Sequence, residues 1–242
     1  MAVAKKTELV EIRPIDIQHI KVRITGDSPL VMHAWDAKAK RQILEKELGF
    51  QKTKEVKDPV GDFMSSMYWL TQMPEDMTMD DFNGAVKNGA RFGFPATAFK
   101  QAAIAAAFRM GWAKDKVSIK SAFFIEPTDA GYYAGDLEIQ GRRIAIIPNV
   151  YKPMPMVEIK STAPRMREDM VRVGMGAADI RYRGEFSDWS AELTIAYNAN
   201  GQYSFDQIVN MINAGGFACG VGEMRPEKDG QNGMFHVAAD GE

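Results

Sequence analysis

The sequence has little cysteine and no long apolar run. Of its 242 residues only Cys219 is a cysteine, so no internal disulfide can form and stability must come from packing, which suits a reducing cytoplasm. The longest apolar run, from Ala102 to Phe108, is far shorter than the roughly 20 residues that a membrane-spanning helix needs. The N-terminus has lysines followed by polar residues in place of an apolar signal region. We therefore expect a cytoplasmic protein with no membrane partner.

The sequence also lacks an excess of charge of one sign. A formal net charge of -2 and a pI near 6.0 argue against a protein that coats duplex nucleic acid by bulk positive charge. Any nucleic-acid site must therefore be local. The 16 methionines are scattered along the chain, which favours adaptable core filling over an adaptable interface.

Common cofactor and metal motifs are missing as well. Cys219 has no cysteine or histidine at zinc-type spacing. The Gly220-Val221-Gly222 stretch lacks the third glycine of a dinucleotide loop and follows a predicted helix, and no Walker lysine-serine pair occurs. These absences predict no cofactor and no metal, and they favour a binding protein over an enzyme.

Hydrophobic periodicity, capping residues and turn residues predict the elements. Strands are expected at about 16–25, 117–125 and 234–238, with a strand pair at 180–183 and 189–197, a hairpin at 137–147 turned at Gly141 and an extended arm or edge strand at 151–164. Helices are expected at about 36–48, 62–71, 80–90, 95–110 with Thr97 able to cap, and after Ser204.

This order predicts an α+β protein with a ferredoxin-like (RRM-like) βαββαβ core. A helical insertion follows the first strand and a strand-rich insertion lies in the middle. The chain is expected to form a single domain over 1–242, with the core at about 16–26, 92–125 and 178–238, the helical insertion at about 36–90 and the arm at about 136–175.

A glycine-rich stretch from Gly215 to Gly222 is the most unusual in the chain. Gly215 and Gly216 are expected to end a helix by a left-handed cap. Gly220 and Gly222 would expose backbone N–H groups to a phosphate chain, with positive charge from the nearby Arg225 and Lys228. The alternative is a helix cap followed by a hairpin into the last strand.

Two further groups of basic residues are candidate phosphate contacts. Lys100 lies in the first turns of a predicted helix, where the N-terminus favours an anion, although the helix start is also explained by capping alone. The segment from Lys160 to Arg183 contains six basic residues and three acidic ones. Aromatic residues in and next to it suit the stacking of bases. The basic residues are Lys160, Arg165, Arg167, Arg172, Arg181 and Arg183, and the aromatic ones are Tyr182, Phe186 and Trp189. The alternative is a strand pair with its rings turned into the core.

The stretch Phe94 to Lys100 and the stretch Gly215 to Gly222, in this order, resemble the RAMP superfamily, which includes CRISPR effector backbone subunits and CRISPR RNA-processing nucleases. Alanine stands where that family often has serine or glycine in the first stretch. The resemblance implies binding of single-stranded RNA, or by analogy DNA, along one face of the sheet, often by subunits stacked into a filament. The chain also resembles small prophage-encoded proteins, which implies a bacterial host cell.

Three hypotheses follow. The first is a non-catalytic binder of single-stranded RNA or DNA that assembles into a homo-oligomer or filament along its ligand, with contacts from Lys100, the arginines, Gly220, Gly222, Arg225 and Lys228. The second is a metal-independent endoribonuclease that uses His33, with Asp36 as the competing candidate. The third is a structural or inhibitory protein that makes protein contacts through Met154, Met156 and the proline-rich arm.

Overall fold

A computed structural model describes residues 14–34, 37–49, 56–128, 137–139, 142–144, 155–173 and 176–239. Its largest sheet has seven strands in the order β12-β1-β11-β8-β4-β3, with β5 also paired to β11. All of the pairs are antiparallel. The strands are β1 Ile17–Gly26, β3 Tyr68–Trp69, β4 Phe92–Pro95, β5 Phe123–Glu126, β8 Met156–Ser161, β11 Trp189–Asn198 and β12 Phe235–Val237.

Alternation of apolar and polar residues gives this sheet one buried face. Along β11 every second side chain is buried. In the β1–β11 register, Val22 lies opposite Leu193 and Ile24 opposite Ala191, and all four are buried. Successive side chains of a strand point to opposite faces of the sheet. The apolar side chains therefore share one face, which needs a covering layer.

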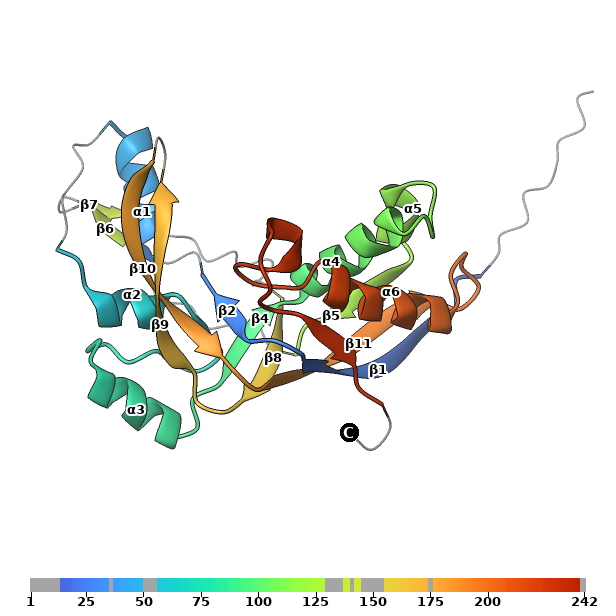
Figure 1. The fold of residues 1–242 in the computed structure, drawn as a ribbon, viewed down its shortest axis with the longest axis horizontal. Coiled ribbons are helices and arrows are strands. Elements are labelled where there is room, and N and C mark those ends of the chain that lie inside the picture. The colour runs from blue at the N-terminus through green and yellow to red at the C-terminus, as the bar shows by residue number, and fades with distance from the viewer. Residues whose placement is uncertain are drawn as a thin grey trace, which may run out of the picture.

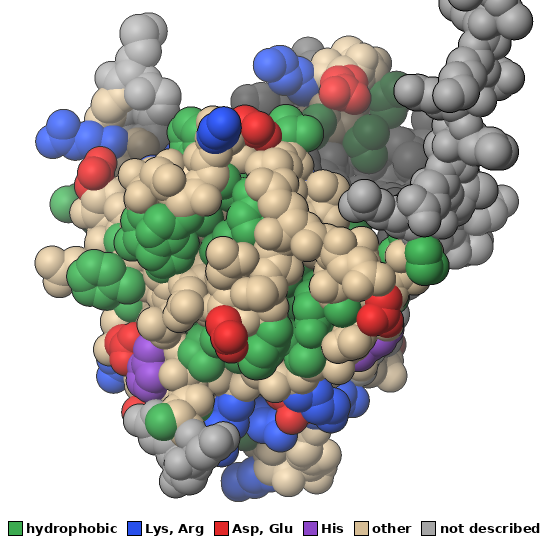
Figure 2. Space-filling view, turned by 90° about the vertical axis from the view of Figure 1, so that its right-hand side faces the viewer, with side chains coloured by type: hydrophobic (Ala, Val, Ile, Leu, Met, Phe, Trp, Pro, Cys, Tyr) green, Lys and Arg blue, Asp and Glu red, His purple; other side chains and the backbone are tan. Residues whose placement is uncertain are grey.

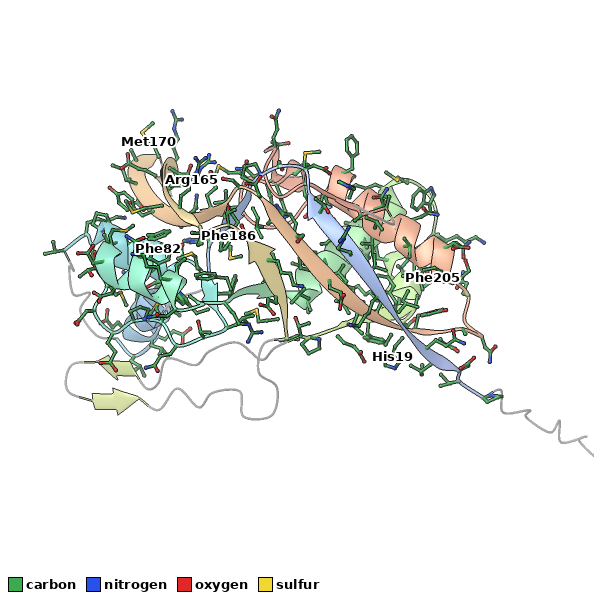
Figure 3. The ribbon with its side chains drawn as sticks, turned by 90° about the horizontal axis from the view of Figure 1, so that it is seen from below. His19, Phe82, Arg165, Met170, Phe186 and Phe205 are labelled. Atoms are coloured by element: carbon green, nitrogen blue, oxygen red, sulfur yellow. The ribbon has the colours of Figure 1, made fainter. Side chains whose placement is uncertain are left out.

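Two helices supply that layer (Figure 1). They are α4 Ala96–Arg109 and α6 Phe205–Ala218, and the side of the sheet away from them carries no helix in Figures 1 and 3. Ser204 caps α6 in a capping box with Gln207, as expected from the sequence. In chain order, α4 lies between β1 and β5, and α6 lies between β11 and β12.

A second, smaller sheet and several helices complete the described structure. The sheet has the order β2-β10-β9, and a separate pair joins β6 and β7. The strands are β2 Leu30–Met32, β6 Leu137–Ile139, β7 Arg142–Ile144, β9 Arg165–Val173 and β10 Ala177–Phe186. The helices are α1 Ala37–Glu47, α2 Pro59–Ser65, α3 Met79–Lys87, α5 Lys116–Lys120 and the 3-10 helix η1 Pro226–Lys228.

One hydrophobic core connects the helical insertion to the large sheet. Phe63 and Phe82 of the insertion belong to the same buried cluster as Leu193 and Phe99. The rings of Phe92 and Phe186 meet edge to face, 5.5 Å apart, and so join β4 to β10. The α+β class expected from the sequence is confirmed. No helix in the described parts is long and apolar enough to cross a bilayer.

Several element predictions were wrong. The helix expected at 62–71 ends at Ser65, and Tyr68–Trp69 form strand β3 instead. The expected strand at 117–125 begins as helix α5, because Asp115 caps it through the Ser118 N–H, and only β5 is extended. The strands expected to pair at 180–183 and 189–197 lie in different sheets, since β10 pairs with β9 and β2.

A further error concerns the proline-rich arm. Its described part forms β8, which lies inside the sheet between β11 and β4. Proline lacks the N–H that an inner strand must donate, but Pro155 and Pro164 fall outside β8. The prolines therefore bound an inner strand instead of marking an edge.

Candidate nucleic-acid interface

The residues after α6 form a loop that is fixed against β2. In this glycine loop, residues 220–225, Gly220 and Gly222 have φ of 62° and 82°, a region that L-residues with a side chain rarely adopt. The Glu223 N–H donates to the Val31 carbonyl at 2.9 Å. A Cβ on Gly222 would lie 2.6 Å from that same carbonyl oxygen. Both glycines are therefore required by close packing.

Gly215 and Gly216 have a different role from the one expected. Both lie inside α6 and not at its end. A Cβ on Gly215 would lie 2.7 Å from the backbone N of Ala103, and one on Gly216 would overlap the carbonyl oxygen of Phe235. They allow α6 to approach α4 and β12, so their prediction as a helix cap was wrong. Thr97 likewise does not cap α4, whose N-cap Pro95 makes no side-chain cap bond.

The glycine loop borders a hollow of about 210 Å³. The hollow lies where the loop, the start of α4, strands β3 and β4 and the residue after β2 meet. It is lined by His33, Tyr68, Phe94, Pro95, Ala98, Gln101, Ala102, Gly220, Val221, Gly222, Glu223, Arg225 and Glu227.

Several polar groups of the hollow are bonded to the protein. Arg225 donates to Glu227 at 3.1 Å and to the carbonyl of Gly222 at 3.0 Å. Arg181 Nη1 lies 3.1 Å from His33 Nε2. Because a guanidinium can only donate, His33 Nε2 is the acceptor in this contact. This contact uses the lone pair that a general base would need.

An antiparallel pair, the arginine ribbon formed by β9 and β10, approaches the glycine loop from the second sheet. Cross-strand partners include Arg167 with Arg183 and Arg165 with Glu185, so these side chains share one face of the ribbon. Arg183 Nη2 lies 3.5 Å from Glu223 Oε2, and Arg167 Nη2 lies 3.8 Å from the sulfur of Met224. The fold thus brings together two groups that are distant in the sequence.

Carboxylates neutralise most of the ribbon's arginines. Glu185, with a side chain only 3% exposed, accepts from Arg165 Nε at 2.6 Å and from Arg167 Nη1 at 2.7 Å. Asp169 accepts from Arg167 and Arg183 at 2.8 and 3.2 Å. Burial raises the pKa of Glu185, but hydrogen bonds and charges from Arg167 and Arg165 outweigh it, so its pKa lies below the ordinary value.

The five predicted ribbon arginines therefore differ in their access to solvent. Arg183 is 5% exposed, so the prediction that it contacts a phosphate was wrong and its role is structural. Arg181 and Arg167 are about one third exposed and ion-paired. Arg165 is paired but 70% exposed. Arg172 is exposed, and no ion pair is found for it among the described residues.

Lys100 lies apart from this region. Its Nζ donates to the carbonyl of Lys120 at 2.7 Å and lies 3.9 Å from the ring centroid of Phe124. Burial lowers its pKa. The side chain covers β5 and does not extend to the hollow, so the fold does not bring Lys100 to the other candidates. Lys228, in η1, is exposed next to the glycine loop.

The remaining predicted residues are placed as follows. Phe186 and Trp189 are buried and unavailable for stacking, while Tyr182 is half-buried. Met156 is buried in β8, so the expectation that it lies in a protein interface was wrong. Asp36 and Met154 lie outside the described residues. Among the residues that the structure describes, no cluster of His, Cys, Asp and Glu suits a metal ion.

The helix-free face of the large sheet carries charges of both signs. Lys21 Nζ lies 2.7 Å from Glu192, and His19 Nδ1 lies 3.1 Å from Glu126. Figure 2 shows Lys and Arg side chains beside Asp and Glu along its lower side, where this face lies. Phe124, 58% exposed on β5, offers this face an aromatic ring.

Sequence reasoning missed three lining residues of the hollow, Tyr68, Gln101 and Glu223. Tyr68 lies in a segment expected as a packing helix, and Gln101 directly follows Lys100 in a helix of which only Lys100 was a candidate contact. Glu223 directly follows Gly222, but only the positive charges near the glycine loop were predicted to bind a ligand.

No protein-family model and no curated protein matches the sequence. Among solved structures, the crystal structure of Cmr6 from Pyrococcus furiosus is similar with a TM-score of 0.39 and 8% sequence identity. The match covers 93% of this chain and 100% of that chain. A similarity of this size supports no inference about activity.

Proposed function

We propose that this protein is a non-catalytic binder of single-stranded nucleic acid, RNA or DNA, built on a ferredoxin-like core of RAMP type. The strand order β12-β1-β11-β5, with α4 and α6 as the connecting helices, supports the βαββαβ assignment. The shared hydrophobic core of insertion and sheet supports one domain. The motif resemblance of Phe94 to Lys100 and Gly215 to Gly222 supports the family.

The observation that carries the proposal is the meeting of the glycine loop with the arginine ribbon. Arg183 and Arg167 contact Glu223 and Met224 of the loop, so a strand lying over the loop also passes beside the ribbon. Gly220 is buried and its N–H donates to the Gly215 carbonyl at 2.9 Å, so Gly222 is the glycine whose backbone a phosphate chain would approach. Exposed cations beside it supply the charge that phosphates require.

The ion pairs limit how many phosphates the surface can neutralise. Arg165, Arg172 and Lys228 are the predicted contacts that are exposed, whereas Arg183 and Arg167 are held by carboxylates. Two or three neutralised phosphates give a slope of log affinity against log salt of about −1.4 to −2.1 for a single strand. We therefore expect weak to moderate affinity with a shallow salt dependence.

Fluorescence anisotropy with labelled 20-nucleotide single strands at several salt concentrations tests this proposal. The double variant Arg165→Gln/Arg172→Gln should bind more weakly and lose about 1.4 from the magnitude of the salt slope. The control Lys87→Gln removes an exposed lysine from α3, on another part of the surface, and should change neither. Absence of binding, or an affinity that does not change with salt, contradicts the proposal.

The same samples test the endoribonuclease alternative. Since His33 Nε2 accepts from Arg181, we expect labelled RNA to remain intact after incubation with the protein. Cleavage by the wild-type protein that is lost in His33→Ala would contradict the non-catalytic function and favour the endoribonuclease.

A further inference from the structure

The polar groups that line the hollow fall into two classes. Arg225, Glu227 and His33 are bonded to other protein groups. Within the described part of the chain, no hydrogen bond is found for the Tyr68 hydroxyl, the Gln101 amide or Oε1 of Glu223. Polar groups that line a concave surface without protein partners are the groups that orient a ligand.

Aromatic rings form part of the same wall. Tyr68 and Phe94 meet at 5.7 Å between ring centroids and 89° between planes, and both line the hollow. A volume of about 210 Å³ is below the roughly 300–1,000 Å³ of pockets for drug-sized ligands. The space therefore suits one small planar group beside a ring.

We propose that the hollow receives one unstacked nucleobase of the bound strand, with preference for guanine. This inference rests on the proposed function, because the hollow adjoins the glycine loop over which the strand would pass. Sequence-specific recognition of single strands commonly uses bases that are splayed out, stacked on aromatic rings and hydrogen-bonded at their Watson–Crick edges.

Glu223 supplies the reason for guanine. The Watson–Crick edge of guanine presents two adjacent donors, N1–H and the 2-amino group, which suit an acceptor-only carboxylate. Adenine and cytosine place an acceptor nitrogen beside their amino group, and uracil and thymine place carbonyl oxygens on either side of their one N–H. A carboxylate there disfavours all four, because it cannot donate.

The other unpartnered groups complement the O6 of guanine. The Tyr68 hydroxyl and the Gln101 amide can each donate to a carbonyl oxygen. Burial, and secondly the charge of Glu223, raises the pKa of Tyr68, so its hydroxyl keeps the proton that it would donate. Arg183, 3.5 Å from Glu223 Oε2, offsets the carboxylate charge while leaving Oε1 and the second lone pair of Oε2 for the two donors of the base.

The test compares 15-nucleotide oligouridine strands that carry one central guanosine, adenosine, cytidine or uridine, by anisotropy at fixed salt. The wild-type protein should bind the guanosine strand about tenfold more tightly than the uridine strand, the discrimination of a good bidentate pair. Glu223→Gln should bring this ratio close to one, whatever the absolute affinities. Tyr68→Phe, which keeps the ring and removes the hydroxyl, should also reduce the ratio. It serves as the test if Glu223→Gln does not fold.

Glu192→Gln is the matched control, since Glu192 lies on the helix-free sheet face and pairs with Lys21. It should keep the wild-type ratio. Equal binding of all four strands by the wild-type protein overturns the base site and leaves the nucleic-acid function standing. Failure to bind any strand overturns the proposed function itself, so the two failures are distinguishable.

Discussion

Two adjacent glycines, Gly215 and Gly216, allow close packing of α6 and do not end the helix. Gly215 and Gly216 lie in α6, although glycine is unfavourable in a helix interior by about 1 kcal/mol relative to alanine. The cost is offset because the bare backbone lets α6 approach Ala103 on α4 and Phe235 on β12. The prediction that glycine permits an unusual backbone conformation was therefore correct for Gly220 and Gly222 and wrong for Gly215 and Gly216.

Replacing Gly216 by alanine tests that account. The added Cβ would overlap the Phe235 carbonyl oxygen, so we expect the free energy of unfolding to fall by about 1–3 kcal/mol, the usual cost of overpacking. Gly84→Ala in α3 is the control, because nothing lies within 4 Å of the added atom, and it should stabilise the protein by about 0.5–1 kcal/mol. Urea denaturation of both variants measures the difference, and equal effects would contradict the account.

At the scale of elements, the arginine ribbon has a charged face whose side chains pair across and along its two strands. Arg165, Arg167 and Arg183 share Glu185 and Asp169 as partners. Removing one partner of a buried pair leaves an uncompensated charge, which is costly. The ribbon therefore depends on its carboxylates, and its stability should depend on pH.

The sign of that dependence follows from Glu185. Its pKa is below the ordinary value in the folded protein, so its contribution to stability is present above about pH 4.3, the ordinary pKa of glutamate. The contribution is lost as pH falls through the lower folded pKa. Glu185→Gln should thus be less stable than wild type at pH 7, and the difference should shrink toward pH 3.

Urea denaturation at several pH values between 3 and 7 measures this difference. Glu75→Gln, which removes an exposed carboxylate from a loop before α3, is the matched control and should leave the pH profile unchanged. A Glu185→Gln profile parallel to that of the wild type would show that the ribbon does not depend on this carboxylate.

For the whole molecule, the proposed assembly along nucleic acid makes a prediction about stoichiometry. If copies line up on one strand, the mass of the complex should increase stepwise between 20- and 60-nucleotide strands in mass photometry. Exposed side chains such as Trp112 and Phe217, 48% and 69% accessible, provide apolar surface for contacts between copies.

The protein without nucleic acid is the reference sample, and we expect it to stay monomeric. One copy on strands of every length would contradict assembly. Assembly without any nucleic acid would instead favour the structural or inhibitory function that relies on protein contacts alone.

The sequence by itself determined the local features. Alternation in β1 and β11 predicted half-buried strands, and Ser204 with the apolar stripe of α6 predicted a capped helix. These predictions succeeded because periodicity and capping depend on neighbours within a few residues. The glycine loop as a special backbone region was predictable for the same reason, since φ above zero is a local requirement.

Only the tertiary structure decided which strands pair and which charges remain available. Nothing local in β8 distinguishes an edge strand from an inner one, and nothing local in β10 selects β9 over β11. Likewise, six basic residues between Lys160 and Arg183 look like a cationic surface. Pairing with Glu185, Asp169 and Glu223 buries or neutralises part of that charge. Glu223 comes from elsewhere in the fold, and Glu185 meets Arg165 and Arg167 only through the register of β9 with β10, because ion pairing depends on distance in space and not on distance along the chain.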